Sequence, residues 1–435
     1  MIKAIVNTCI YDFQSYIDQG FVLFDDKILE VGKMTSFVDQ NYEIIDGSKY
    51  LVMPGLVTGH THIYSTFARG MSVPFHPENF QDILDQLWWK LDRNIDLDTI
   101  YYSGIVSAVD HVKNGVTTLI DHHASGMDIK GSLETLKKAV CDDVKLRGVF
   151  AFETSDRFDV DQAIEENVSF SKRYSSPFTK GLFGLHASMS LSEQTLKKVK
   201  ASLKDIPIHI HVAESTMDEK DCQNKYQEKI IKRLDRHGLL NKNSIIAHAI
   251  YVDDEELDII KKNDCVIAVN FSSNMNNSVG VPPLKSFRDH NIKVIIGNDG
   301  ISSAMTTEYL GLYYQTHLLD QTPNLFGLNE LKKIIDDTYQ YASLMLGVKL
   351  GRLEKGYEAD ILMVPYLPPT PMNQNNALGH LFFGLFHSFK PQHVFVAGKK
   401  IVDHYEVKKE LIKTYDQARV YAQKLWDRIN LEDKS

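Results

Sequence analysis

Residues 54–62, PGLVTGHTH, decide how the chain is organised, because they form a short apolar run that ends in two histidines. In a β-strand, residues i and i+2 point to the same face, so His60 and His62 direct their imidazoles at one place beyond the strand's C-terminal end. Two converging neutral imidazoles supply half of a site for zinc or a similar divalent ion. The alternative is a pair of strand histidines with hydrogen bonds satisfied in the core.

Seven more apolar runs follow, separated by segments with a helical spacing of apolar residues. The eight runs cover residues 54–62, 116–123, 147–153, 181–186, 206–214, 244–248, 265–270 and 293–300. The helical segments include residues 133–140, 194–203, 219–236 and 254–261. Eight buried strands alternating with helices are typical of a (β/α)8 barrel, so we expect an α/β fold with a TIM barrel over residues 54–350.

Both ends of the chain carry short strand signals instead. They lie at residues 4–7, 21–24, 28–31, 43–45 and 50–53, and again at 359–364 and 393–402. The spacing from residue 406 to about 431 predicts a terminal helix. We therefore expect residues 1–53 and 351–435 to pair into one small composite β-sandwich domain beside the barrel.

A long insert, residues 63–95, follows the first strand and contains Trp88 and Trp89. The insert could cover the mouth of the barrel. For the two tryptophans we favour a packing role, in which they hold a helix over residues 80–92 against the barrel.

The composition is that of an ordinary globular protein, with 435 residues, 43% of them hydrophobic, and a net charge of −9. No basic run favours nucleic acid, and no apolar run approaches the roughly 20 residues that span a bilayer. The four cysteines are scattered without a CxxC pair, and the N-terminus lacks the apolar core of a signal peptide. We expect a cytoplasmic protein that binds neither nucleic acid nor membrane.

Ionisable residues gather at the C-terminal ends of the predicted strands, which is where barrel enzymes build their active sites. His60 and His62 end the first strand, His211 lies on the fifth, and Asp299 lies on the eighth. Three imidazoles and one carboxylate, with a position left for water, make a catalytic metal site.

Three nearby residues are candidates for the chemistry. Glu214, three residues after His211, could move protons, or it could be an acid that stabilises a helix N-terminus. His248 could polarise the scissile group or stabilise a developing anion, or it could be structural. His186 ends the fourth strand, where two-metal hydrolases often carry a lysine. We therefore expect one metal ion, with His186 a substrate contact or a bystander.

Other polar residues receive weaker assignments. Arg69 could contact a carbonyl or carboxylate of the substrate, or it could form a surface salt bridge. We do not expect a ligand role for the remaining histidines and acids at strand ends. These are Asp121, His122, His123, Glu153 and His209.

With these residues in place, the chain resembles the amidohydrolase superfamily over essentially its whole length. The resemblance is carried by residues 54–62, 209–214, 247–248, 298–300 and 356–361. Within the superfamily it is similar to the cytosine deaminase, guanine deaminase and chlorohydrolase branch. Residues 62–71, 87–92, 121–125 and 273–277 are most similar to the SsnA aminohydrolase group.

The resemblance implies one divalent metal ion, zinc or iron (Zn2+ or Fe2+), on the four predicted ligands. It implies that Asp299 takes a proton from the attacking water, that Glu214 protonates a ring nitrogen, and that His248 orients the reactants. The predicted enzyme is a metal-dependent aminohydrolase that acts on carbon–nitrogen bonds other than peptide bonds. Its substrate would be a small purine- or pyrimidine-like heterocycle, and analogy predicts a homodimer.

Some motifs depart from the group. Residues 247–251 read AHAIY where relatives read AHCxH, residues 269–271 read VNF where HNP is common, and residues 297–299 read GND where GTD is common. These changes leave the metal ligands in place but leave the substrate open, so a cyclic amide hydrolase or a chlorohydrolase remains an alternative. A catalytically dead barrel used as a binding protein predicts loss of a ligand or of Glu214, and all are present.

Overall fold

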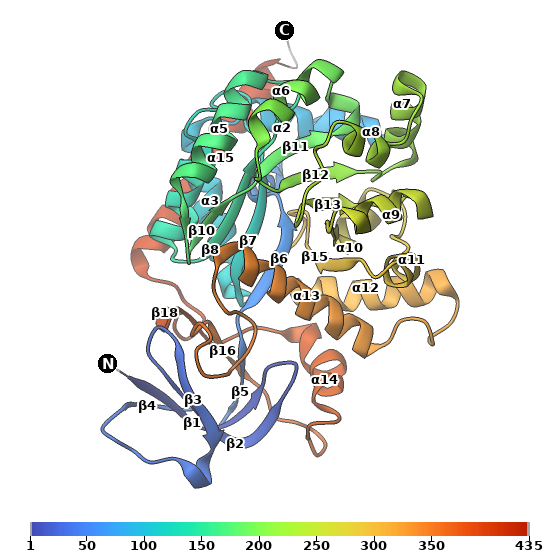
Figure 1. Ribbon diagram of the computed structural model, residues 1–435. Coiled ribbons are helices and arrows are strands. Elements are labelled where there is room, and N and C mark those ends of the chain that lie inside the picture. The colour runs from blue at the N-terminus through green and yellow to red at the C-terminus, as the bar shows by residue number, and fades with distance from the viewer. Residues whose placement is uncertain (1, 433–435) are drawn as a thin grey trace.

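The computed structural model describes residues 2–432. Figure 1 shows an α/β body above a smaller β-rich part that contains the blue N-terminal strands. The smaller part is one eight-stranded sheet in the order β18-β17-β16-β5-β1-β2-β3, with β4 paired to β1. Its strands are β1 (Lys3–Tyr11), β2 (Tyr16–Phe24), β3 (Ile28–Lys33), β4 (Glu43–Asp46), β5 (Tyr50–Pro54), β16 (Ile361–Pro365), β17 (His393–Val396) and β18 (Lys399–Val402).

Strand β5 connects this sheet to the α/β body. It pairs with β1 in parallel and with β16, from the other end of the chain, antiparallel. The chain then passes through Gly55, whose N–H donates to the carbonyl of Asp360 at 2.9 Å, and enters β6. A Cβ at Gly55 would collide with the side chain of Thr117, so this junction requires glycine.

Each of the eight apolar runs contains a strand of the body. These strands are β6 (Leu56–Thr61), β7 (Val116–His123), β8 (Arg147–Phe152), β11 (Phe183–Ala187), β12 (Ile208–Val212), β13 (Ile245–His248), β14 (Val266–Val269) and β15 (Lys293–Ile296). All neighbouring pairs among them that are hydrogen-bonded as ladders are parallel. Parallel strands covered on both faces read as continuous apolar runs, which explains the sequence pattern.

The strand expected over residues 181–186 is interrupted at Leu182. Strand β10 (Thr179–Gly181), which ends where this run begins, pairs with β8 and with the short β9 (Ser175–Ser176), whereas β11 pairs with β12. The Asn167 side chain occupies the division: its Oδ1 accepts from the N–H groups of Phe152 (2.8 Å) and Gly184 (3.1 Å), and its Nδ2 donates to the Phe152 carbonyl (2.8 Å). A side-chain amide thus replaces the missing strand-to-strand bonds.

The two five-stranded sheets meet at both edges. On one side, the Thr154 N–H donates to the Gly184 carbonyl at 3.0 Å. On the other, the Asn298 N–H donates to the His60 carbonyl at 2.9 Å. A Cβ at Gly297 would collide with the His60 backbone, so a glycine at this position lets the end of β15 lie against β6.

Helices surround these strands, as Figure 1 shows. The longer ones are α3 (Leu97–Lys113), α4 (Ser132–Lys137), α5 (Val160–Arg173), α6 (Glu193–Leu203), α7 (Thr216–Tyr226), α8 (Ile230–Arg236), α9 (Asp254–Lys262), α10 (Phe271–Asn276), α11 (Leu284–Asp289), α12 (Met305–Asp320), α13 (Leu328–Leu346) and α15 (Lys409–Glu432). The helix expected over residues 219–236 is two helices, because Gln227 adopts a left-handed conformation (φ 58°) and ends α7. Across residues 2–432, no helix combines the length and apolar character needed to cross a membrane.

The insert after β6 contains α1 (Phe80–Ile83), a π-helical turn (Leu84–Trp88) and α2 (Trp89–Arg93). Helix α15 holds this region in place. The Trp426 Nε1 donates to the carbonyl of Phe67 at 2.7 Å, and Arg428 pairs with Asp96 at 2.5 Å. The terminal helix therefore fixes the loop that follows the two histidines.

A buried arginine joins the body to the small sheet. Arg147, at the start of β8, is completely buried and binds Asp360 through Nε and Nη2, both at 2.9 Å. Its Nη2 also reaches Glu358 at 2.9 Å. Both carboxylates are almost fully buried, so the guanidinium compensates two charges that water cannot reach.

We predict that Arg147→Met lowers the free energy of unfolding by about 3–5 kcal/mol, because the buried Asp360 loses its counter-charge and Glu358 is left with the half-exposed Lys27, at 3.4 Å. Urea denaturation followed by circular dichroism measures this change. Arg173→Met is the matched control, because Arg173 pairs with Glu134 at an exposed position and should leave the midpoint unchanged. An unchanged midpoint for Arg147→Met would contradict the assigned role.

Candidate active site

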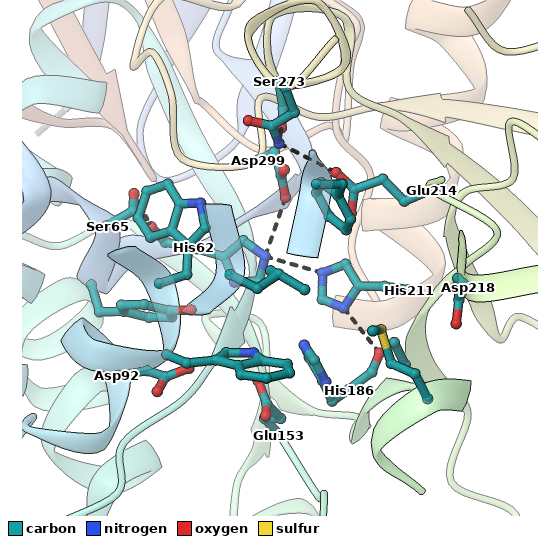
Figure 2. A pocket seen from close by; sticks show the side chains of 18 of the residues that line it. His62, Ser65, Asp92, Glu153, His186, His211, Glu214, Asp218, Ser273 and Asp299 are labelled. Atoms are coloured by element: carbon teal, nitrogen blue, oxygen red, sulfur yellow. Dashed lines mark hydrogen bonds and ion pairs between the residues drawn. The ribbon is translucent and has the colours of Figure 1, made fainter. Parts of the chain in front are cut away.

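Four side chains converge beyond the ends of β6, β12 and β15. The Nε2 atoms of His60 and His62 lie 2.8 and 3.1 Å from Oδ1 of Asp299. The Nε2 atoms of His62 and His211 lie 3.0 Å apart. One atom from each of the four side chains falls within 4.8 Å of the others. Figure 2 shows His62, His211 and Asp299 pointing toward one another.

The hydrogen bonds behind this cluster determine where the free electron pairs lie. Nδ1 of His62 is 2.6 Å from the His122 carbonyl, and Nδ1 of His211 is 3.0 Å from the His186 carbonyl. A carbonyl accepts only, so both Nδ1 atoms carry the hydrogen and both neutral rings present a free electron pair at Nε2. Two such nitrogens, 3.0 Å apart beside a carboxylate, are held together by a shared positive charge, either a proton on one of the rings or a bound cation.

The electrostatics of the cluster also favour a positive charge. Burial lowers the pKa of His62, but the hydrogen bond to Asp299 and its charge outweigh burial and raise that pKa to about 9. Burial raises the pKa of Asp299, but His248, His60 and His62 together hold it well below its usual range.

The donor set therefore fits one divalent metal ion of the kind that prefers nitrogen and oxygen ligands. Backbone carbonyls orient two of the three imidazoles, as is usual for metal-binding histidines. The third, His60, has its Nδ1 2.7 Å from Nε2 of His209, which lies one layer deeper in the core.

Glu214 and His248 lie beside this cluster. Nε2 of His248 is 3.5 Å from Oε2 of Glu214 and 3.9 Å from Oδ2 of Asp299. Burial raises the pKa of Glu214, and the charge of Asp299 adds to this effect, against the opposing influence of His248 and Asn277. A carboxyl with a raised pKa can hold a proton and donate it to a substrate.

The turns that present these groups have an unusual backbone. His248 (φ 70°), Ala249 (φ 51°), Ala213 (φ 49°) and Asp299 (φ 54°) all adopt the left-handed region without being glycine. Such conformations cost of order 1–3 kcal/mol each and gather at functional sites. Here they turn the chain sharply where β12, β13 and β15 end.

The insert forms the opposite wall of the pocket. Its contribution consists of Tyr64, Ser65, Phe80, Leu84, Trp88, Trp89 and Asp92. The packing role favoured for the tryptophans is confirmed for Trp88, which packs against the core, and both tryptophans also line the pocket. The periodicity of the segment predicted a helix but did not tell which side of that helix faces the barrel mouth.

A charged group that sequence reasoning missed supports this wall. Arg157, after β8, pairs with Asp92 at 2.5 Å and lies 3.6 Å from Glu153. Its guanidinium also stacks 4.8 Å from the ring of Trp89. The sequence placed Glu153 at the end of a strand. No sequence pattern, however, predicts that Asp92 contacts Arg157.

The structure separates the two residues proposed for substrate contact. His186 lines the pocket, with Nδ1 2.7 Å from Oγ of Ser190. Arg69 lies outside this pocket, and its exposed guanidinium pairs with Asp110 at 2.9 Å. Arg69 thus occupies the surface salt bridge that was the alternative to a substrate contact.

Comparison with known proteins identifies similar chains. The model of the amidohydrolase family matches residues 51–401. The 5-methylthioadenosine/S-adenosylhomocysteine deaminase of Pyrococcus furiosus is 28% identical over 384 residues, which cover 85% of this chain and 88% of the relative. The 5'-deoxyadenosine deaminase of Methanosphaera stadtmanae is 26% identical over 379 residues, which cover 85% of this chain and 86% of the relative.

Solved structures share the fold. An adenosine deaminase from Xanthomonas campestris with bound zinc superposes with a TM-score of 0.82 at 18% identity, covering 97% of this chain and 98% of that one. Atrazine chlorohydrolase from Arthrobacter aurescens, complexed with zinc, has a TM-score of 0.80 at 19% identity, covering 98% and 100%. At this identity the likeness concerns the fold alone.

We predict that the purified protein binds about one divalent ion per chain, and that His211→Ala and Asp299→Asn abolish this binding. Elemental analysis measures the metal content. Removing the ion with a chelator should lower the thermal midpoint of the wild type, because a ligand that binds the folded state stabilises it. The two variants should show no such response.

The matched control is His404→Ala. His404 belongs to a second group, His393, Asp403 and His404, whose ligand atoms also fall within 4.8 Å of one another. There Lys400 already supplies a positive charge to Asp403 at 3.2 Å, so this variant should keep the ion. Loss of the ion in His404→Ala, but not in His211→Ala, would contradict the assigned site.

Proposed function

Because the chain belongs to the amidohydrolase family, we propose that it is a metal-dependent aminohydrolase that releases ammonia from a small purine-like heterocycle. One observation carries the proposal: the four candidate metal ligands lie beside Glu214 in a single pocket, and the pKa of Glu214 is raised. The names of the curated relatives, which deaminate adenosine derivatives, favour a purine over a pyrimidine.

A divalent ion held by His60, His62, His211 and Asp299 would lower the pKa of water enough to supply hydroxide near neutral pH. Asp299 has one oxygen, Oδ2, directed away from the histidine ligands and toward His248. That oxygen accepts the proton that the attacking water loses.

The remaining protons come from the neighbouring pair. Glu214 donates its proton to the ring nitrogen next to the carbon under attack, so that negative charge does not build up on the ring. His248, between Glu214 and Asp299, hydrogen-bonds the oxygen that adds to this carbon. The proton held by Asp299 then passes to the exocyclic amine, the carbon–nitrogen bond breaks, and ammonia leaves. The hydroxyl proton of the adduct passes to Glu214 as the ring carbonyl forms, so both carboxyl groups return to their starting states.

The charges on the pocket wall bear on the choice of substrate. Acidic residues line it: Asp92, Glu153, Glu214, Asp218 and Asp299. No lysine or arginine is among the lining residues in the described part of the chain, and nearby Arg157 is paired with Asp92. We infer that the pocket accepts neutral or cationic heterocycles and rejects phosphorylated ones.

The ion is proposed to be zinc, with iron as the alternative, because three imidazoles and a carboxylate are typical of catalytic zinc sites. The zinc-bound structures of similar fold support this choice. His186 is proposed to contact the substrate from the pocket wall, and Arg69 to act only through its pair with Asp110.

The proposed architecture is a closed (β/α)8 barrel over residues 54–350, supported by the contacts at both sheet edges. Residues 1–53 and 351–435 form the small domain. A sandwich-like curl of its sheet is supported by β1, which pairs with β4 over one half and with β5 over the other. A cytoplasmic homodimer is proposed by analogy with relatives.

We expect the metal-loaded protein to release ammonia from at least one compound in a panel of purine bases and nucleosides, pyrimidines, hydantoins and chlorotriazines. Glu214→Gln should lower kcat by a factor of about 10²–10⁴, because it removes the proton donor. Ammonia is measured by a coupled assay, and chloride release and ring opening are followed on the same samples. Ring opening or chloride release without ammonia would overturn the aminohydrolase proposal.

We also predict that an accepted nucleoside loses at least about 100-fold in kcat/KM when it carries a 5′-phosphate, because the described residues that line the pocket include no lysine or arginine to pair with the phosphate dianion. They do include Glu153, where burial raises the pKa but His186 and Arg157 outweigh burial and lower it. Steady-state kinetics with the paired compounds measure this ratio. Glu153→Gln should reduce the fold difference in kcat/KM between the nucleoside and its 5′-phosphate, whereas Arg69→Gln should leave this difference unchanged. Equal turnover of both compounds would contradict the assigned charge selection.

A further inference from the structure

The stretch Ser273–Asn277 has no part in the mechanism above, although the sequence marks it as a motif. It covers most of α10, the short helix between β14 and the pocket. Oδ1 of Asn274 lies 2.9 Å from Nδ1 of His248. Nδ2 of Asn277 donates to Oε1 of Glu214 at 3.3 Å.

We propose that Asn274 and Asn277 are positioning residues, which set the orientation of His248 and Glu214 from a single helix. The proposal rests on the proposed function, because it concerns the two groups assigned to proton transfer and orientation there. It gives a role to two asparagines three positions apart in the sequence.

Helix geometry lets one element hold both groups. Residues i and i+3 lie on the same side of a helix, so Asn274 and Asn277 project together toward His248 and Glu214. Their targets come from different strands, β13 and β12, yet Nε2 of His248 and Oε2 of Glu214 lie only 3.5 Å apart. Small rotations of either side chain would change this separation, and hydrogen bonds from α10 oppose such rotations.

The orientation of Asn277 is fixed by its neighbours. Its Oδ1 accepts from Nδ2 of Asn276 at 3.0 Å, and its Nδ2 also donates to Oγ of Ser273 at 3.2 Å. The amide nitrogen is therefore the end that faces Glu214. One oxygen of Glu214 is occupied by this bond, while the other, Oε2, stays directed at His248.

The ring of His248 depends even more on this helix. Among the described residues, Asn274 supplies the only hydrogen bond to the imidazole, and Nε2 has no hydrogen-bond partner. Both side chains are completely buried. His248 is the last residue of β13 and adopts a left-handed conformation, so the strand ends at this residue.

The helix is in turn anchored from behind. Glu308, on α12, is fully buried and accepts from the N–H and the hydroxyl of Ser272, at 3.0 and 2.5 Å. A Cβ at Gly311 would collide with the ring of Phe271, so a glycine there lets α10 lie against α12. These contacts keep the first turn of α10 in place.

The test uses Asn274→Leu and Asn277→Leu, which keep the branching of the side chain at Cγ and remove the hydrogen bonds. Each should lower kcat about 10- to 100-fold with KM within about twofold, because the buried partner loses its bond. Asn274→Asp retains an acceptor for His248 and should recover most of the activity. Met275→Ala, a change of an exposed side chain on the same helix, should match the wild type.

Metal content and the thermal midpoint of each variant show whether the fold and the ion are intact. A fall in kcat with both unchanged supports positioning. Wild-type kcat in both leucine variants overturns the proposal. A rise in KM equal to the loss in kcat/KM also overturns it for Asn277, because this side chain lines the pocket and would then be a substrate contact.

A second readout does not depend on turnover. The imidazole ¹⁵N resonances of His248, assigned by their loss in His248→Gln, should shift in Asn274→Leu and stay unchanged in Met275→Ala. If the wild type turns over no compound but the resonances shift, the proposed function fails and the positioning contact stands. If they do not shift in Asn274→Leu, the positioning of His248 by Asn274 is overturned.

Discussion

The site depends on one constraint: the Nε2 atoms of His62 and His211, whose electron pairs repel one another unless a positive charge lies between them, are 3.0 Å apart beside Oδ1 of Asp299. Side chains in water would separate or become protonated. The fold holds them together because the other nitrogen of each ring donates to a backbone carbonyl of a neighbouring strand or its end, at His122 and His186. The repulsion is thus balanced by the strands themselves, and a cation that enters the cluster finds its ligands already arranged.

Bringing the strand ends this close demands small residues and unusual turns around the cluster. Glycine at position 297 lets β15 lie against His60, and left-handed turns at His248 and Asp299 direct their side chains inward. Asn167 closes the gap where the fourth strand is divided. Each feature costs backbone freedom or regular pairing, and the buried strands around the site supply the stability that makes these costs tolerable.

The features that the sequence predicts correctly are those set by residues close together in the chain. The i, i+2 spacing of His60 and His62 requires only a strand to bring both rings to one side, and the eight apolar runs are set by burial on both faces. The contact between Asp92 and Arg157 joins positions 65 apart, and nothing local encodes it. The roles of the tryptophans and of Arg69 likewise depend on which side of the insert faces the pocket, a tertiary property that periodicity does not contain.

The pocket therefore consists of three parts, each held in place by a different kind of contact. Two of the three imidazoles in the candidate metal cluster are oriented by backbone carbonyls, which side-chain substitutions do not remove. Glu214 and His248, the pair proposed for proton transfer and orientation, are hydrogen-bonded instead by the amide side chains of Asn277 and Asn274. The insert, held by Asp92 and Arg157, forms the wall that meets the rest of the substrate. Because these supports are distinct, changes in the insert can alter the choice of substrate while the cluster and its chemistry stay the same.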